Sequence, residues 1–394
     1  MNSDIALLDI GSSRISVLIG SHGPNKTVQI TAAHHLKFDV YYNGKWFDKN
    51  QLYLAIKTAV LAVESARGIK IKRLYVGVPA EFSSVIAKKT TISFDKSKKI
   101  TSLDIEKLKK NGLDSVANPS LTIIHDRAIS YTLDDGRSLI MPEGEKTKLL
   151  TGFISYIFAE NKFVLVLKKI LTQIGILDFK FICPTLAQAM FLIDHEIRDR
   201  TAVLIDCGYL STTVALVRGD GILSLKTMNL GGANVSFEIG KRLDIDLSLA
   251  EAIKQRISVT SIPSASDTIT FDNGILGQET EYSMSEAVQG AIEAVVQIGD
   301  GAKQLVDMCE FDVPQNMVVF LTGGGISFIR GAREIVQMSL SERETVLAKM
   351  PPPHLEKHQN SSIVSLLDMI LDETEQGLQK KSVMASIIGF LLGD

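Results

Sequence analysis

The sequence predicts a two-lobed α/β protein. Its 394 residues exceed what one compact hydrophobic core usually holds. An apolar strand that ends in Asp-x-Gly and resumes after small hydroxyl residues occurs twice, in LLDIGSSRISVLIG (7–20) and TAVLIDCGYLSTTVALV (201–217). A repeat spaced by about half the chain indicates two related lobes rather than a short-period solenoid. A third stretch, NMVVFLTGGGISFIRGA (316–332), joins a buried strand to a helix through three consecutive glycines.

The composition argues against several classes of function. The net charge of −3 is close to neutral, whereas a nucleic-acid binder is expected to carry a strongly basic face. The three cysteines, Cys183, Cys207 and Cys309, form no zinc-ligand or disulfide pattern, which favours a reducing compartment. The N-terminal residues lack the features of a signal peptide, and no apolar run is long enough to span a membrane. We therefore expect a cytoplasmic protein that binds no nucleic acid.

Each copy of the repeat predicts a β-hairpin whose turn can bind an anion. Glycine and small hydroxyl residues let consecutive backbone N–H groups approach a ligand, and such N–H groups form an anion nest. The residues concerned are Gly11, Ser12, Ser13 and Arg14 in the first copy, and Gly208, Ser211 and Thr212 in the second. Asp9 and Asp206 end the preceding strands, where a divalent cation or its water shell needs oxygen ligands. The competing interpretation is that both are simply turns.

Two further glycine-containing elements accompany the repeat. Gly323, Gly324 and Gly325 cost much chain entropy, which makes sense where backbone must lie flat against a ligand. Gly231 and Gly232 open a second element, in which Glu251 and Lys254 are three residues apart and share a helix face. Glu251 also fits a structural role, because Ser248 and Glu251 have the spacing of a helix capping box.

Taken in this order, the four elements resemble the actin-like ATPase superfamily, and within it the FtsA family of bacterial cell-division proteins. The two repeats resemble its phosphate motifs and residues 316–332 its adenosine motif. KIKRLYVGVPAEFSSV (70–85) resembles the junction into the small inserted domain of that family, where TSLDIEKLKKNGLDSV (101–116) predicts a helix begun by Thr101 or Ser102. The resemblance implies an actin-like fold of duplicated ribonuclease H-like domains with an inserted SHS2-type domain.

The resemblance also implies a division into four parts. The first lobe is expected to comprise 1–79, 168–199 and 380–394, and the inserted domain 80–167. The second lobe is expected to comprise a core of 200–229 and 316–379 and a subdomain of 230–315.

By the same resemblance, ATP or ADP with Mg²⁺ binds in the cleft between the lobes. Asp9 and Asp206 hold the cation through water, the two turns hold the phosphates, and the remaining glycines flank the nucleoside with Glu251 and Lys254. The family further implies a role as a division scaffold or adaptor, self-association into filaments, and an FtsZ-like tubulin homologue as partner. Such a protein is recruited to the division site or the membrane by its partners.

The sequence departs from the family in three places. Tyr209 and Leu210 stand where the family has a glycine-rich run, so we expect weaker nucleotide binding. Cys183 stands where many relatives have a Gln or Glu that activates water, so we expect slow or absent hydrolysis, with Gln188 as a possible substitute. KSVMASIIGFLLGD (381–394) predicts a last core helix rather than a basic amphipathic membrane anchor.

Two other functions remain open. A nucleotide-independent docking platform of the pilus-assembly (PilM-like) or division type is favoured by Cys183, Tyr209 and Leu210. A sugar or small-metabolite kinase would share the phosphate turns, but it needs a catalytic aspartate in a substrate cleft, for which we find no convincing candidate.

Overall fold

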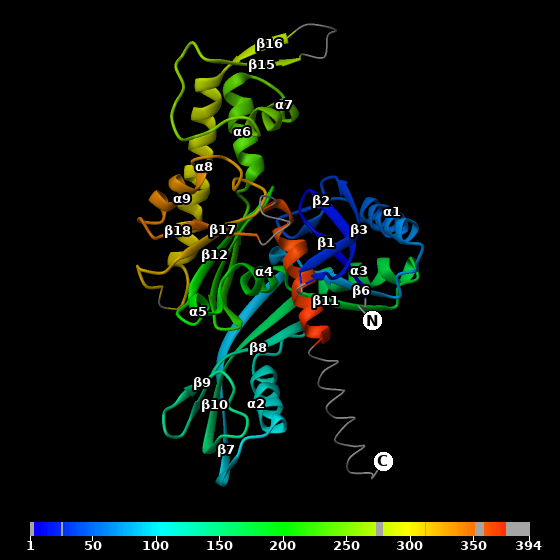
Figure 1. Cartoon of the computed structure of the whole chain (residues 1–394), viewed down its shortest axis with the longest axis vertical. Helices are drawn as coiled ribbons and strands as arrows, with labels where there is room; N and C mark the ends of the chain where they lie inside the picture. The colour runs from blue at the N-terminus through cyan, green and yellow to red at the C-terminus, as the bar shows by residue number, and fades with distance from the viewer. Residues whose placement is uncertain (1–3, 25–26, 273–278, 312, 351–357, 376–394) are drawn as a thin grey trace.

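The computed structural model describes residues 4–24, 27–272, 279–311, 313–350 and 358–375. Within these residues, two sheets of five strands each form the body of the molecule (Figure 1). The first has the order β11-β6-β1-β2-β3 and the second the order β14-β13-β12-β17-β18. In each sheet three antiparallel strands are followed by two parallel ones. The duplicated sequence motif therefore corresponds to a duplicated sheet.

The hairpins of the repeat have the same register in both sheets. β1 (Ile5–Ile10) pairs with β2 (Arg14–His22) so that Asp9 faces Ser16, and β12 (Ala202–Cys207) pairs with β13 (Thr212–Arg218) so that Asp206 faces Thr213. The remaining strands are β3 (Val28–Lys37), β6 (Arg73–Gly77), β11 (Asp178–Ile182), β14 (Gly221–Met228), β17 (Val319–Thr322) and β18 (Thr345–Leu347).

Helices cover the first sheet. α1 (Lys49–Arg67) begins at Asp48, whose carboxylate accepts two backbone N–H groups, and ends at Gly68 in the left-handed conformation. The small hairpin of β4 (Tyr41–Tyr42) and β5 (Lys45–Trp46) carries Trp46 onto the rings of Phe82 and Phe163. η2 (Ala80–Phe82) and α3 (Asn161–Gln173) also lie on this side. α4 (Pro184–Leu192) lies in the core shared by the two large sheets, and α5 (His195–Arg198) lies beside the second sheet, where Arg198 Nε donates to the carbonyl of Gly219 at 3.1 Å.

A separate sheet of order β7-β10-β8-β9 is inserted after η2 and extends away from the two larger sheets (Figure 1). It consists of β7 (Ser83–Lys99), β8 (Leu121–Leu133), β9 (Ser138–Leu139) and β10 (Lys146–Glu160). α2 (Ser102–Asp114) packs on one face and is capped by Thr101, which confirms the helix predicted there. The Ser155 hydroxyl donates to the carbonyl of Ile222 at 2.6 Å, so the inserted sheet also contacts the second lobe.

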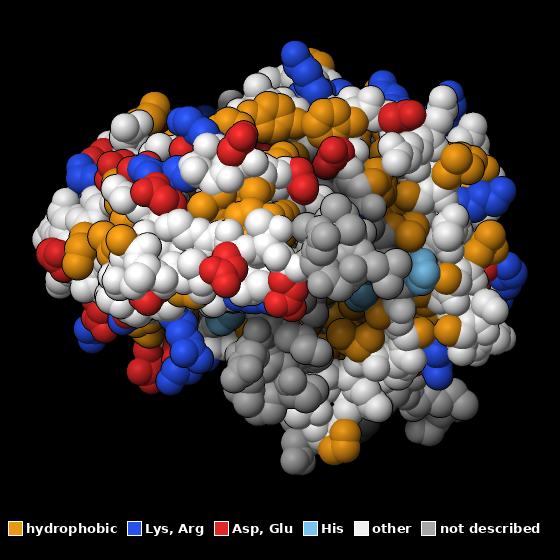
Figure 2. All heavy atoms as spheres, turned by 90° about the horizontal axis from the view of Figure 1, so that it is seen from above, with side chains coloured by type: hydrophobic (Ala, Val, Ile, Leu, Met, Phe, Trp, Pro, Cys, Tyr) orange, Lys and Arg blue, Asp and Glu red, His pale blue; other side chains and the backbone are white. Residues whose placement is uncertain are grey.

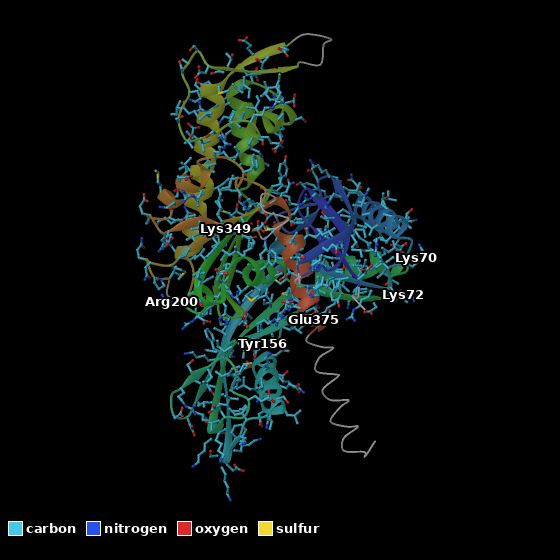
Figure 3. The ribbon with its side chains drawn as sticks, in the orientation of Figure 1. Lys70, Lys72, Tyr156, Arg200, Lys349 and Glu375 are labelled. Carbon is cyan, nitrogen blue, oxygen red and sulfur yellow. The ribbon has the colours of Figure 1, made fainter. Side chains whose placement is uncertain are left out.

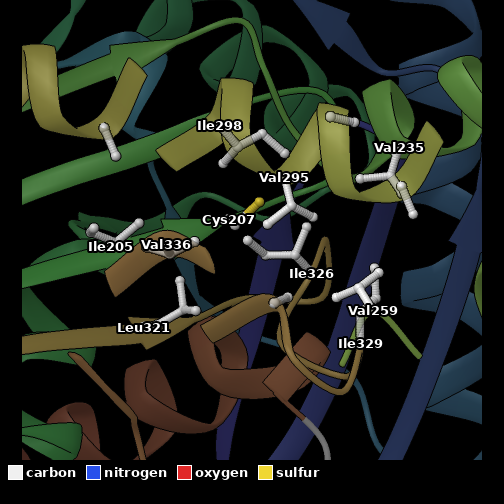
Figure 4. Packing of buried hydrophobic residues seen from close by; sticks show 14 of the residues in the cluster. Ile205, Cys207, Val235, Val259, Val295, Ile298, Leu321, Ile326, Ile329 and Val336 are labelled. Atoms are coloured by element: carbon white, nitrogen blue, oxygen red, sulfur yellow. The ribbon is translucent and has the colours of Figure 1, made fainter. Parts of the chain in front are cut away.

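The second sheet carries a largely helical subdomain. α8 (Met284–Asp307) packs its apolar face against α6 (Gly232–Leu243) and β13 in a core that also includes Cys207 and Ile326 (Figure 4). α7 (Leu247–Lys254) and the hairpin of β15 (Thr268–Asp272) and β16 (Glu279–Ser283) complete it, and α9 (Ala332–Ser339) packs between α8 and β18 of the second sheet. Seen from above, this side of the molecule carries acidic and basic side chains interspersed with exposed hydrophobic ones (Figure 2).

Residues 361–375 are α-helical, follow η3 (His358–Asn360) and pack in a core that contains side chains of both large sheets. A Cβ atom at Gly20 of β2 would lie 2.3 Å from the Leu367 side chain, and one at Gly77 would lie 3.0 Å from Leu366. We expected this segment in the second lobe, but it fits closely against the first sheet as well. The segment 381–394, predicted as a core helix, lies outside the described residues. Among the described helices, none is both long and apolar enough to cross a membrane.

Candidate functional site in the interlobe cleft

The turns of the two repeats lie against each other across the lobes. In each turn the glycine N–H donates a hydrogen bond to the carbonyl of the third residue after it. Gly11 donates to Arg14 and Gly208 to Ser211, both at 2.8 Å. The backbone N–H of Leu210 then donates to Ser12 Oγ at 3.3 Å. The predicted phosphate-binding turns are therefore neighbours in space, although about 200 residues separate them in sequence.

The two predicted metal-binding carboxylates lie beside these turns. Asp9 accepts a hydrogen bond from Ser362 Oγ at 2.8 Å, and burial raises the pKa of its carboxyl group. Asp206 accepts one from Gln188 Nε2 at 2.8 Å. Burial, together with the negative charges of Asp9 and Glu81, raises the pKa of Asp206 to about 6. Both carboxylates are therefore costly to ionise in this environment, and a nearby cation would stabilise them.

Glu81 is a third acidic residue of the cleft, and sequence reasoning missed it. Its carboxylate accepts hydrogen bonds from Tyr41 Oη at 3.3 Å and from the Ser211 hydroxyl. Glu81 lies in η2, which packs against the first sheet although it falls at the start of the expected inserted domain, whereas Ser211 lies in the second phosphate turn. This pair therefore ties the lobes together, as the Ser12–Leu210 pair does.

The glycines of the other two elements pack on the backbone of the second turn. The N–H of Gly325 donates to the carbonyl of Cys207 at 2.8 Å, and that of Gly232 to the carbonyl of Gly208 at 2.9 Å. A Cβ atom on Gly325 would lie only 2.3 Å from the Gly208 oxygen. Close approach between backbones thus explains why these positions are glycine, in addition to any ligand they hold.

Glu251 and Lys254 form a buried ion pair under two aromatic rings. Lys254 is 1% exposed and donates to Glu251 Oε2 at 2.6 Å and to the carbonyl of Gly232 at 2.9 Å. Its ammonium lies 5.9 Å from the ring centres of both Tyr209 and Phe328. Burial lowers the pKa of Lys254, while the hydrogen bonds from Lys254 and Ser236 outweigh burial and lower that of Glu251. The Ser248 capping box does not form, because Asp246 caps α7 instead.

The other predicted residues bond to or pack against backbone groups near the two turns. The Thr212 hydroxyl donates to the carbonyl of Leu230 at 2.7 Å, so it holds its own hairpin. The Ser13 carbonyl accepts from Phe38, and Arg14 Nη2 donates to the carbonyl of Gln359 at 2.7 Å. Gly323 adopts φ +93°, and Gly324 is exposed. Gly231 lies against the carbonyls of Gly208 and Tyr209.

The chain is similar in sequence to several cell division proteins. No protein-family model matches the chain. It is 26% identical over 337 residues to the cell division protein FtsA of Streptococcus pneumoniae, covering 84% of this chain and 72% of that one. It is 24% identical to FtsA of Enterococcus faecalis, with 81% and 73% covered.

Solved structures show the same fold. A PilM–PilN type IV pilus biogenesis complex matches with a TM-score of 0.58 and 17% identity, covering 94% of this chain and 99% of that one. ADP-bound MreB5 of Spiroplasma citri matches with a TM-score of 0.54 and 13% identity, covering 96% and 98%. The chain has the actin-like fold and is a divergent relative of FtsA.

In this FtsA relative, Cys183 is poorly suited to activate water. Its side chain is fully buried at the start of α4, and burial raises the pKa of its thiol to about 11. Its backbone N–H donates to His125 Nε2 at 3.1 Å. Gln188, one turn further along α4, is the residue whose side chain reaches Asp206. Its Oε1 atom is buried with no hydrogen-bond partner among the described residues.

The helix of residues 361–375 connects the cleft of the FtsA relative to its inserted sheet. At one end Ser362 binds Asp9, and Ser361 Oγ accepts from Gln188 Nε2 at 3.0 Å. At the other end Glu373 accepts from Arg127 of β8 and, at 3.1 Å, from Lys180 of β11. The carboxylates of the cleft and the inserted sheet thus contact opposite ends of one rigid element.

The donor set of the cleft fits a magnesium–phosphate ligand. Mg²⁺ typically keeps several waters and takes one or two carboxylates, which Asp9 and Asp206 supply. Within the described residues no group of three His, Cys, Asp or Glu side chains forms a closed metal cage. Thr322, the neighbour of Asp206 across β12 and β17, has a buried Oγ1 with no partner among the described residues. Beside Asp206, Gln188 Oε1 can therefore accept a hydrogen bond from water, and the Thr322 hydroxyl can donate one to water or to a ligand oxygen.

Proposed function

We propose that this protein is an FtsA-like cell-division scaffold that binds ATP or ADP with Mg²⁺ in the cleft between its lobes. The observation that carries the proposal is the contact of the two Asp-x-Gly turns, with Ser12 on one side and the Leu210 N–H on the other, 3.3 Å apart. A phosphate chain that replaces this contact would accept hydrogen bonds from both turns.

Each part of the cleft has a role in this proposal. Gly11, Ser12, Ser13 and Arg14, with Gly208, Ser211 and Thr212, hold the phosphates, mainly through backbone N–H groups. Asp9 and Asp206 bind the water shell of Mg²⁺, which neutralises phosphate charge when it is bound. Gly231, Gly232, Glu251, Lys254, Gly323, Gly324 and Gly325 flank the nucleoside.

We propose slow hydrolysis or none. A general base must lie within hydrogen-bond reach of the attacking water and have a suitable pKa. The Cys183 thiol meets neither condition, because it is buried and its pKa is raised to about 11. Gln188 can orient a water through Oε1, but an amide cannot remove its proton.

Such a protein acts by assembling with partners or with itself rather than by forming a reaction product. The relatives named cell division protein FtsA support a role at the division site, with an FtsZ-like tubulin homologue or other division proteins as partners. The solved MamK double helical filament, at a TM-score of 0.53 and 12% identity, supports self-association. Fold alone does not fix function, so both are tested separately from nucleotide binding.

We also propose the four-part division stated above for this scaffold, with the inserted domain at 80–167 as a docking module. Its contacts support coupling to both lobes: His125 accepts the Cys183 N–H of the first lobe, and Ser155 binds Ile222 in β14 of the second.

A second candidate function is a docking platform that needs no nucleotide. Two contacts favour it, because they give groups of the site partners without a nucleotide. Ser12 Oγ accepts the Leu210 N–H, and the Tyr209 ring lies over the Lys254 ammonium. The PilM–PilN complex supports the idea that this fold can serve in a binary docking complex.

Calorimetric titration with ATP and ADP, with and without Mg²⁺, separates the two. The scaffold proposal predicts Mg²⁺-dependent binding that Asp206→Ala abolishes and that Asp114→Asn, an exposed carboxylate on α2, leaves intact. Phosphate release in the same samples measures hydrolysis. Absence of binding at millimolar nucleotide rejects the first function and leaves the docking platform.

A further inference from the structure

A cavity of about 610 Å³ opens on the outer side of the first lobe, where α1 ends and α3 turns into β11. Its volume lies within the range of roughly 300–1,000 Å³ that is typical of ligand pockets. Lys70 and Lys72, which help to line it, point away from the second lobe in Figure 3. None of the interlobe residues described above lines this cavity, so it is a separate feature of the molecule.

The cavity has an apolar floor and an apolar mouth. On the floor, Val60 is 4% exposed, Ile71 7% and Ile176 2%. At the mouth, Leu61 is 48% exposed and Leu177 75%. Exposed leucines beside a concave apolar surface are typical of a binding site, because water leaves both when a ligand enters.

The charged residues around the cavity leave an excess of positive charge. Glu64 is nearly buried, and its carboxylate is satisfied by Lys70 Nζ at 2.5 Å and by the Ile71 N–H at 2.8 Å. Asp178 lies 3.7 Å from Arg73 Nε. Two more lysines, Lys57 and Lys72, line the cavity without an ion pair to any described residue.

We propose that this cavity binds a short acidic peptide segment of a partner protein. The apolar side chains of the peptide enter the cavity between Leu61 and Leu177, and its flanking carboxylates pair with Lys57 and Lys72. The apolar floor disfavours an inorganic anion, which gains nothing from burial there. The concave shape disfavours a membrane, because a flat bilayer cannot enter a cavity that the side chains of a peptide can enter.

The proposal does not depend on nucleotide binding in the interlobe cleft. Peptide selection tests it with the full chain as bait. Displayed random 12-residue peptides are selected on the wild-type protein and counter-selected on Lys57→Glu/Lys72→Glu. We expect enrichment of peptides with a central Leu, Ile, Met or Phe flanked by Asp or Glu. Enrichment of neutral or basic peptides, or of none, overturns the proposal.

An enriched peptide is then titrated by fluorescence anisotropy. We expect at least tenfold weaker binding to the Lys57→Glu/Lys72→Glu variant and to Leu177→Ser, and weakening at high salt. Lys148→Glu, an exposed lysine of β10, serves as the matched control and should bind normally. Because Lys57, Lys72 and Leu177 are all exposed, the variants should fold, which circular dichroism checks.

A parallel assay with lipid vesicles tests whether the ligand of this cavity is a membrane rather than a peptide. Sedimentation with phosphatidylserine vesicles should not depend on Lys57 and Lys72. If vesicle binding is lost in the charge-reversed variant while no acidic peptide is enriched, the surface binds lipid and the peptide proposal is wrong.

Discussion

Gln188 Nε2 donates a hydrogen bond to Asp206 Oδ2 at 2.8 Å and thereby links α4 to β12, the first strand of the second repeat. The bond lowers the pKa of Asp206, whereas burial and the nearby carboxylates raise it to about 6. The fold therefore disfavours the charged form of the Asp206 carboxyl group, and a bound cation would stabilise that form.

Asp206→Asn should stabilise the protein and abolish Mg²⁺-dependent nucleotide binding. Asn keeps an oxygen for Gln188 but carries no charge to bury. Because the folded pKa is raised from 3.8 to about 6, wild-type stability falls as pH rises through this window. At pH 7 the variant should gain about 1–3 kcal/mol, and the gain should vanish near pH 4. Urea unfolding measures this, and an equal effect at both pH values would contradict it.

Gln188→Leu should raise the pKa of Asp206 further, because it removes the hydrogen bond that stabilises the charged form. More of Asp206 would then be protonated at pH 7. The pH at which Mg²⁺–ADP affinity is half-maximal should shift upward, as calorimetry from pH 5 to pH 8 would show. Met190→Leu on the same helix is the control, and an unshifted profile would exclude the role given to Gln188.

Tyr209→Ala should strengthen nucleotide binding. The ring lies over Lys254, and a nucleoside that approaches the ammonium must compete with it. A cation–π contact is worth roughly 0.5–2 kcal/mol, so the gain should be several-fold or more. ADP titration measures it, with Tyr42→Ala, an exposed tyrosine, as the control. Weaker binding would show instead that Tyr209 itself holds the ligand.

His125→Gln should make the protein less sensitive to acid. His125 is buried and accepts the Cys183 N–H, and burial, with the charges of Arg127 and Lys180, lowers its pKa to about 3. The unfolded chain takes up a proton near pH 6.5 and the folded chain does not, so stability falls as pH falls below 6.5.

Gln keeps an acceptor for the Cys183 N–H but does not titrate. The slope of unfolding free energy against pH should therefore fall by up to about 1.4 kcal/mol per pH unit between pH 6 and pH 4. Urea midpoints at several pH values measure it. Asp206 and Asp368, whose pKa values are raised to about 6, act in the opposite sense and are common to both proteins. Parallel curves would refute the assignment.

Gly325→Ala should destabilise the second lobe by at least about 1–3 kcal/mol, the usual cost of overpacking. Its new methyl would lie 2.3 Å from the Gly208 carbonyl, which is backbone and cannot move aside easily. Gly11→Ala, whose methyl would lie 3.2 Å from the Arg14 oxygen, should cost less. Thermal unfolding compares the two, and an equal loss would argue against backbone packing as the cause.

The sequence was sufficient to predict the parts of the cleft that its repeat contains. Asp9 and Asp206 occupy equivalent places in two copies of one hairpin, so their equivalent positions follow from the pattern alone. The helix at Thr101 was predictable as well, because its cap is local. These features depend on neighbours in the chain and not on the tertiary fold.

Other features depend on contacts between distant segments. Glu81 gives no local signal, since its partner Ser211 is 130 residues away. The apolar residues of 361–375 would suit either sheet, so their place between the two could not be read from periodicity. The glycines were interpreted through a ligand, whereas Gly325 and Gly232 first of all allow three loops to approach one another.

The helix of residues 361–375 has a consequence for biosynthesis. Ser362 meets Asp9 across 353 positions of the chain, and Ser361 meets Gln188 across 173. Strands β1 and β2 leave the ribosome first, yet the hydrogen bond that Asp9 receives from Ser362 is made by one of the last described segments to appear. The cleft can thus be completed only after residues 361–375 have been synthesised, and a chain interrupted before residue 361 would expose the apolar surface that this helix covers.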